Sequence, residues 1–102
     1  MIIVTPFMLI VFLNLIKNYS KKLVTLGMKD LLLKKEFILK AIEEIRPNLS
    51  QLFPEQIEIF NSLDESVKKE SFQNINREAV MLMMIELAKL KQHIIKKLER
   101  AV

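Results

Sequence analysis

The sequence predicts an all-α protein, a small antiparallel bundle of three amphipathic helices preceded by an apolar N-terminal helix. Glycine occurs once and proline three times among 102 residues, of which 51% are hydrophobic, a composition typical of helix-rich globular chains. Apolar residues recur every three or four positions across residues 28–46, 57–67 and 80–101, the spacing of one helix face. Short connections around Pro47 and Asn74 favour antiparallel neighbours.

The chain is long enough for a domain with its own core, because a domain of this size buries roughly 60–70% of its unfolded surface. We expect residues 1–27 to form an apolar helix and a basic hinge, and residues 28–102 to form the bundle domain. The absence of cysteine excludes disulfides, thiolate chemistry and cysteine-ligated zinc. The net charge of +4 divides into +5 over residues 17–40, −4 over residues 41–70 and +3 over residues 71–102, which we interpret as complementary solvated faces.

Residues 1–16 contain no charged side chain and are followed by Lys17, Lys21 and Lys22. One interpretation is a membrane anchor. A helix of that length reaches roughly 24 Å against a hydrocarbon core of about 30 Å, so it would span only with snorkelling or local thinning. The lysines would then hold the bundle on the cytoplasmic side, and the expected location is cytoplasmic or membrane-associated.

Other interpretations of residues 1–16 remain open. The segment would equally suit a buried helix of a soluble bundle or an oligomer interface. A continuous helix from this segment through Leu26 is compatible with the good helix formers that follow. A translation start at Met28 would leave the segment out of the protein altogether.

The first amphipathic pattern predicts a helix over residues 28–46, after a break near Gly27. Its apolar positions form a broad face, and lysine and glutamate fill the other side. Pro47 disfavours helical geometry in the residue before it, so we expect this helix to end at Arg46.

The second amphipathic pattern predicts a helix that starts at Pro54. Proline suits the first helical position, where its missing N–H has no partner to lose. Two acid-to-base pairs four residues apart, which begin at Asp64 and Glu65, favour helix through Lys69. A capping-box pattern at Ser62 would instead break the helix there, and we expect continuity.

The last helix is expected to run about 25 residues from an N-cap at Asn76, with Ile75 and Val80 placed for a hydrophobic staple. Basic residues near its end match the negative end of the helix dipole. Its apolar face is broader than a two-stranded coiled-coil seam. The positions at helical spacing are Val80, Met83, Leu87, Leu90, Ile94, Leu98 and Ala101, widened by Leu82, Ile85, Ala88 and Ile95.

No motif in the chain carries recognisable chemistry. His93 is the only histidine and has no partner at a fixed spacing, so we place it on the polar shoulder of the last helix. Adjacent carboxylates such as Glu43 and Glu44 point about 100° apart on a helix and cannot face one reacting bond. Gly-rich phosphate loops and nucleophile elbows are absent. We therefore expect no catalytic residue, metal ligand, cofactor, small-molecule substrate or enzymatic activity.

The methionines Met81, Met83 and Met84 form a dense group of flexible side chains, which suits either an adaptable partner groove or the protein's own core. In the first case the last helix presents a partner-binding face. The predicted members of this face are Met81, Met84, Leu87, Lys91, Ile94, Ile95 and Leu98.

Lysines gathered in the first third of the chain would contact the phosphates of an anionic membrane or a nucleic acid. The predicted members are Lys17, Lys21, Lys22, Lys29, Lys34 and Lys35. Only three arginines and no helix-turn-helix signature make nucleic acid the weaker of the two partners.

These features predict a non-enzymatic interaction or assembly subunit, tethered to a membrane or a larger assembly by residues 1–16. Its partner would be another protein or further copies of the chain. The alternative hypothesis is a soluble basic helical regulator that binds nucleic acid as an oligomer. Under the first hypothesis, removal of residues 1–27 should leave a folded domain that no longer sediments with membranes.

Overall fold

The computed structural model describes residues 4–26, 31–69 and 77–101, and every element in these ranges is helical. The elements are α1 (Pro6–Leu26), α2 (Leu31–Leu52), the 3₁₀ turn η1 (Pro54–Gln56), α3 (Ile57–Lys69) and α4 (Arg77–Ala101). The predicted all-α class is therefore confirmed.

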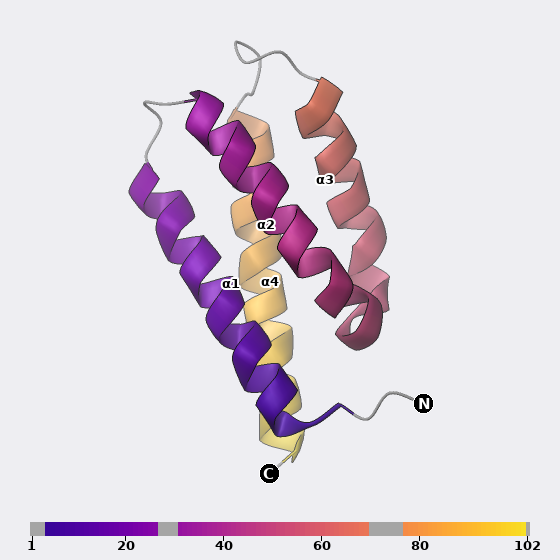
Figure 1. Ribbon diagram of the computed structural model, residues 1–102. Helices are drawn as coiled ribbons and strands as arrows, with labels where there is room; N and C mark the ends of the chain where they lie inside the picture. Colours follow the sequence, from indigo (N-terminus) through magenta and orange to yellow (C-terminus); the bar gives the residue numbers. More distant parts are fainter. Residues whose placement is uncertain (1–3, 27–30, 70–76, 102) are drawn as a thin grey trace.

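The helices pack as two long neighbouring pairs. Figure 1 shows α1 alongside α4, with the start of α1 and the end of α4 at the same end of the molecule. The most extensive contact joins α1 and α4, and the next joins α2 and α3, while α1 also touches α2 and α3 touches α4. The first and last helices of the chain thus form one of the two main packing units.

Helix α1 runs the full distance from Pro6 to Leu26, which confirms the continuous alternative. Thr5 begins it as an N-cap, because its hydroxyl oxygen accepts a hydrogen bond from the Met8 N–H at 3.2 Å. Pro6 occupies the first helical position, where its missing N–H costs nothing. One side of this helix is buried at steps of three and four residues, by Leu9, Phe12, Ile16, Tyr19 and Leu23.

Within the three described ranges, no helix is long and apolar enough to cross a membrane. Residues 1–3 of the segment considered as an anchor lie outside these ranges. The part of α1 that precedes its first lysine, residues 6–16, is about 16 Å long, roughly half of the hydrocarbon thickness. Phe12 and Ile16 from this part lie in the core, at 1% and 0% exposure.

Helix α2 does not end at Arg46. It continues through Pro47 to Leu52, against expectation. A proline inside a helix removes one backbone hydrogen bond and costs about 3 kcal/mol. The turn after Pro47 offsets this cost, because Leu49, Leu52 and Phe53 are all at most 3% exposed. Burial of three such side chains contributes roughly 1.5–3 kcal/mol each, more than the proline removes.

Two polar side chains near Pro47 donate hydrogen bonds to backbone carbonyl groups of α2. The Asn48 amide donates to the Glu44 carbonyl at 3.3 Å, and the Ser50 hydroxyl donates to the Pro47 carbonyl at 2.8 Å. Each bond returns from a side chain to a carbonyl group three or four residues earlier in the same helix, a pattern common for such polar side chains.

Pro54 opens η1, which leads directly into α3. The helix then continues through Ser62 to Lys69, so the expected continuity is confirmed. Phe60, Leu63 and Val67 form its buried stripe at steps of three and four. Asp64 and Lys68 make the expected ion pair, at 3.1 Å.

Helix α4 has 25 residues, as expected. The N-cap Asn76 and the staple residue Ile75 lie outside the described residues. Lys97, which was expected to complement the end of its own helix, reaches α2 instead. Its ammonium donates to the Leu52 carbonyl at 2.7 Å and lies 4.4 Å from the centre of the Phe53 ring. Lys97 thereby closes the C-terminal end of α2, where carbonyl groups lack helical partners.

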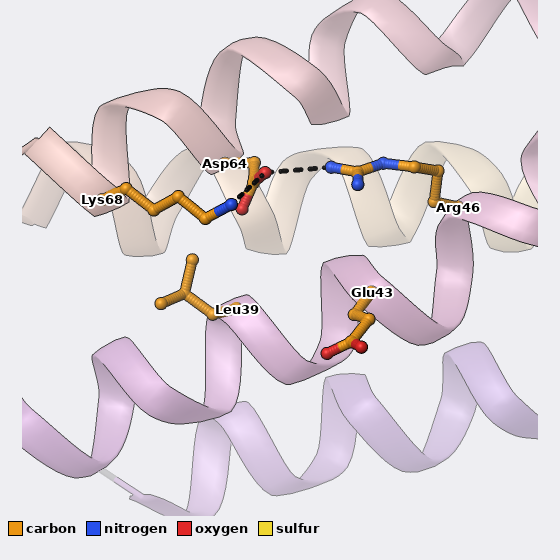
Figure 2. A pocket seen from close by; sticks show the side chains of 5 residues that line it. All are labelled: Leu39, Glu43, Arg46, Asp64 and Lys68. Atoms are coloured by element: carbon orange, nitrogen blue, oxygen red, sulfur yellow. Dashed lines mark hydrogen bonds and ion pairs between the residues drawn. The ribbon is translucent and has the colours of Figure 1, made fainter.

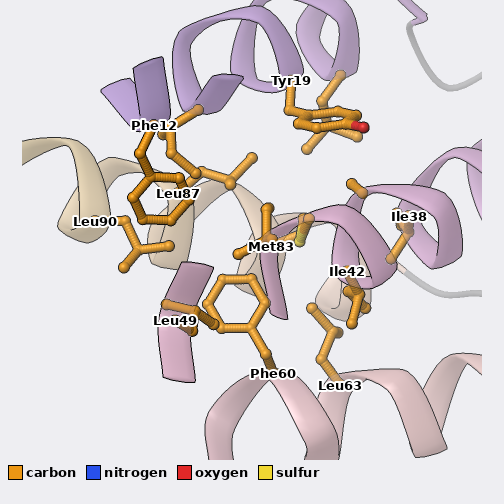
Figure 3. Close-up of a cluster of buried hydrophobic side chains, with 14 of the residues drawn as sticks. Phe12, Tyr19, Ile38, Ile42, Leu49, Phe60, Leu63, Met83, Leu87 and Leu90 are labelled. Atoms are coloured by element: carbon orange, nitrogen blue, oxygen red, sulfur yellow. The ribbon is translucent and has the colours of Figure 1, made fainter. Parts of the chain in front are cut away.

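One hydrophobic cluster includes side chains from all four α-helices (Figure 3). Phe12 of α1 packs against Phe53, with ring centres 6.2 Å apart, and Tyr19 packs against Phe37 at 5.4 Å. Figure 3 shows Phe12 beside Leu87 and Leu90 of α4. The division of the chain near residue 27 stays a prediction, but this shared core argues that residues 28–102 alone would expose the buried face of α4.

The place of α1 in the core predicts a large cost for Phe12→Ala. Deletion of a buried aromatic ring should lower the free energy of unfolding by about 3 kcal/mol, through lost burial and the cavity left behind. Phe7, on the same helix, is 74% exposed. Phe7→Ala should change stability by less than about 0.5 kcal/mol. Urea unfolding followed by circular dichroism measures both, and equal effects would contradict the packing of α1.

Candidate interaction surface

The outer face of α4 is apolar and exposed. Met81, Leu82, Met84 and Ile85 are 57%, 39%, 41% and 48% exposed. Met81 and Ile85 lie on the side of the helix opposite to core residues such as Met83 and Leu87, which are fully buried, and Leu82 and Met84 flank them on either side. We call these four residues the α4 outer face. The sequence left open whether the three neighbouring methionines belong to the core or to the surface. Met83 fills the core, whereas Met81 and Met84 reach the surface.

The seven predicted partner-binding residues do not share one surface. Met81 and Met84 belong to the α4 outer face. Lys91, Ile95 and Leu98 are partly exposed. Leu87 and Ile94 are 0% exposed, so the structure removes them from any contact surface. The physical reason is that α1, α2 and α3 cover one side of α4. The broad apolar face of this helix does not show in the sequence which side is covered.

A shallow hollow of about 350 Å³ extends the α4 outer face toward the C-terminus. His93 lies at its edge, partly buried, with its ring 5.9 Å from that of Phe53. This ring contact gives His93 a packing role. The residues around the hollow are Ile85, Ala88, Lys89, Gln92, His93 and Lys96.

A second exposed apolar patch lies at the start of α1. Phe7, Ile10 and Val11 are 74%, 47% and 52% exposed. They occupy the side of α1 that does not pack on the bundle, whereas Leu9 and Phe12 of the same stretch are buried. The uncharged beginning of the chain thus has both a core side and a surface side.

A polar hollow of about 320 Å³ lies between α2 and α3 (Figure 2). One Asp64 carboxylate oxygen accepts from the Arg46 guanidinium at 3.0 Å and from the Lys68 ammonium at 3.1 Å. Leu39 and Glu43 complete the lining, and Figure 2 shows Glu43 on the α2 side without a drawn contact to Asp64. The sequence predicted the Lys68 pair but not the Arg46 contact, which ties the end of α2 to α3.

The ion pairs determine the protonation of Asp64. Burial of the Asp64 carboxyl opposes its ionisation, but the hydrogen bonds from Arg46 and Lys68 outweigh burial and hold its pKa below the ordinary value. Because the folded-state pKa is lowered, Asp64 stabilises the fold above its ordinary pKa of 3.8 and loses this effect as the pH falls through the folded-state value.

Two further polar groups are buried near the core. The Tyr19 hydroxyl donates to the Glu44 carboxylate and so links α1 to α2. Burial, the hydrogen bond and the charge of Glu44 together raise the pKa of Tyr19 above its ordinary value. Glu86 of α4 is 2% exposed and accepts from the Lys89 ammonium at 3.3 Å. Neither group could be identified from the sequence, because each lies on a helix face that only packing identifies as buried.

The structure separates the predicted anion-contacting lysines. Lys17 and Lys21 line one cavity, while the Lys22 ammonium lies 5.8 Å from the centre of the Phe37 ring. The prediction for Lys34 is wrong. This side chain is 1% exposed and burial lowers its pKa, so it cannot contact an external surface. Lys35 is partly buried, and Lys29 lies outside the described residues.

Among the residues that the structure places, no three His, Asp or Glu side chains gather as a metal ion would require. Comparisons of the chain with protein-family models, curated proteins and solved structures found no match.

The Arg46–Asp64–Lys68 cluster predicts a pH-dependent effect of Asp64→Asn. At pH 7 the free energy of unfolding of the variant should be about 1 kcal/mol lower than that of the wild-type chain. The effect is this small because Arg46 and Lys68 are 42% and 63% exposed and solvent weakens their ion pairs. The difference should shrink as the pH falls below 3.8 and through the lower folded-state pKa of Asp64, where the folded carboxyl becomes protonated. Denaturant titrations at several pH values measure it. Glu65→Gln, at an exposed neighbouring carboxyl, is the control, and a pH-independent difference would contradict the ion-pair argument.

Proposed function

We propose that this protein is a non-enzymatic interaction subunit, which presents the α4 outer face to another protein chain. The observation that carries the proposal is the group of Met81, Leu82, Met84 and Ile85, four adjacent large apolar side chains that are 39% to 57% exposed on one helix. Single exposed apolar residues are ordinary on protein surfaces, whereas contiguous patches mark contact sites.

The chemistry of this face favours a helical partner. Methionine side chains adapt their shape to a facing surface, and apolar residues at helical spacing are the usual anchors of a helix laid against another. The hollow beside Ala88 could accept one apolar side chain from such a partner. The exposed Lys96 at its edge favours an acidic residue next to that side chain.

The scaffold in this proposal is an antiparallel bundle of amphipathic helices. Its support is the buried stripe at three- and four-residue steps on α2, α3 and α4, together with a similar stripe on α1. In this arrangement α4 is packed on one side and free on the other. A free side that is also apolar is a cost in water unless another surface covers it.

The predicted alternative, a regulator that binds nucleic acid, has weaker support from the described surface. Helix α1 carries three lysines and no acidic residue, but these lysines do not form one continuous basic surface, because Lys17 and Lys21 lie beside Lys91 while Lys22 lies over the Phe37 ring. Nucleic acid therefore remains the second candidate.

The proposal predicts that Met84→Glu combined with Ile85→Glu abolishes association without loss of folding. Each new carboxylate would have to be buried without a partner, which should weaken binding at least about tenfold. A photo-crosslinking residue at Met81 detects the contact, and sedimentation velocity of the full chain shows whether the partner is a second copy. Circular dichroism should be unchanged, because both positions are exposed.

The matched control places the same charges elsewhere. Ser62→Glu with Ser66→Glu adds two carboxylates to exposed positions of α3 and should leave association intact. A monomeric chain without a crosslink at Met81, or equal loss in both double variants, would overturn the proposal.

A further inference from the structure

A cavity of about 420 Å³ lies between α1 and α4, the two helices that Figure 1 shows side by side. Helix α1 supplies five of its lining residues and α4 supplies Lys91. The full lining is Lys17, Ser20, Lys21, Val24, Thr25 and Lys91. Three of the six side chains are therefore cationic, and they come from opposite ends of the sequence.

The three lysines carry uncompensated charge. Lys17 and Lys21 lie one turn apart on the same side of α1, an arrangement in which like charges repel. Lys91 adds a third positive charge from α4. None of the three has an ion pair with a carboxylate of the described residues. Helix α1 contains no acidic residue that could supply one.

Several other lysines of the described chain have identified partners. Lys68 pairs with Asp64, and Lys89 pairs with Glu86. Lys97 binds the Leu52 carbonyl, and Lys22 lies over the Phe37 ring. An external anion would supply the cavity lysines with a charged hydrogen-bond partner of the kind that these other lysines find within the chain.

The two hydroxyl groups in the cavity already use their protons. Ser20 donates to the Ile16 carbonyl and Thr25 donates to the Lys21 carbonyl, both at 2.8 Å. The donors available to a ligand are therefore the ammonium groups, each with three N–H bonds. Such a site favours an anion rich in acceptor oxygens. The cavity is open to solvent, so an anion with several linked oxyanion groups can enter it.

We propose that Lys17, Lys21 and Lys91 form a binding site for an oligophosphate, a ligand with two or more linked phosphoryl groups. The phosphoryl groups are held by charge-assisted hydrogen bonds from both helices, so the ligand bridges α1 and α4. Because it binds only the folded chain, it also raises the thermal stability of the protein. This site is separate from the α4 outer face and does not depend on the proposed function.

Inorganic triphosphate is the probe, measured by calorimetry and by thermal unfolding at low ionic strength. The wild-type chain should bind it and unfold at a higher temperature in its presence. Lys21→Gln and Lys91→Gln should each weaken binding about tenfold, the effect of one charge-assisted hydrogen bond. Lys22→Gln removes the same charge from a neighbouring position of α1 outside the cavity, and should weaken binding less than about twofold.

The variants separate a shaped site from general attraction to a basic surface. Equal weakening by Lys22→Gln and Lys21→Gln would overturn the proposal, as would unchanged affinity in Lys91→Gln. Absence of triphosphate binding would overturn it too, and binding of duplex DNA in that case would favour the nucleic-acid alternative.

A second pair of probes identifies the source of the phosphoryl groups. Vesicles that contain a lipid with a polyphosphorylated headgroup are compared with free triphosphate, using the same three variants. Tighter binding to the vesicles, lost in Lys91→Gln, indicates a headgroup as the ligand, and tighter binding to triphosphate indicates a free anion. The Met84→Glu, Ile85→Glu chain should bind triphosphate normally, so failure of the proposed function would not imply failure of this site.

Discussion

The burial of α1 against α4 is the packing interaction on which the rest of this structure depends. Phe12 and Ile16 lie in the common core with Leu87 and Leu90, so the first and last helices cover each other. This contact decides which side of α4 is core and leaves the opposite side, with Met84, on the surface. It also brings the α1 lysines to Lys91, because the two charged stretches meet only when these helices are neighbours.

Much of the fold could be predicted from the spacing of apolar residues. The stripes of α3 and α4 follow helical periodicity, and the order of acid and base at Asp64 and Lys68 correctly indicated a continuous α3. Helix α1 was harder for a physical reason. Its first half is apolar all round, so exposed Phe7 and buried Phe12 look alike in the sequence, and periodicity carries no information about which side is covered.

The remaining differences come from tertiary contacts that outweigh local preference. Pro47 stays inside α2 because the turn after it buries Leu49 and Phe53, a gain that a local rule does not include. The candidate surfaces were only partly predictable for the same reason. The broad apolar face of α4 contained both core and surface residues, and only the positions of the other helices distinguish Leu87 from Met84. Lys17 and Lys21 were identified from charge alone as contacts for an anion, whereas their neighbour Lys91 was assigned to the partner-binding face of the last helix.

The pairing of the first helix with the last also affects how the chain is made. During synthesis α1 leaves the ribosome well before α4, and at typical elongation rates of about 5–20 residues per second the interval lasts several seconds. Throughout this interval the side of α1 that carries Leu9, Phe12 and Ile16 lacks its main cover. Until α4 has been translated, this apolar side of α1 can be covered within the chain only by the smaller contact with α2.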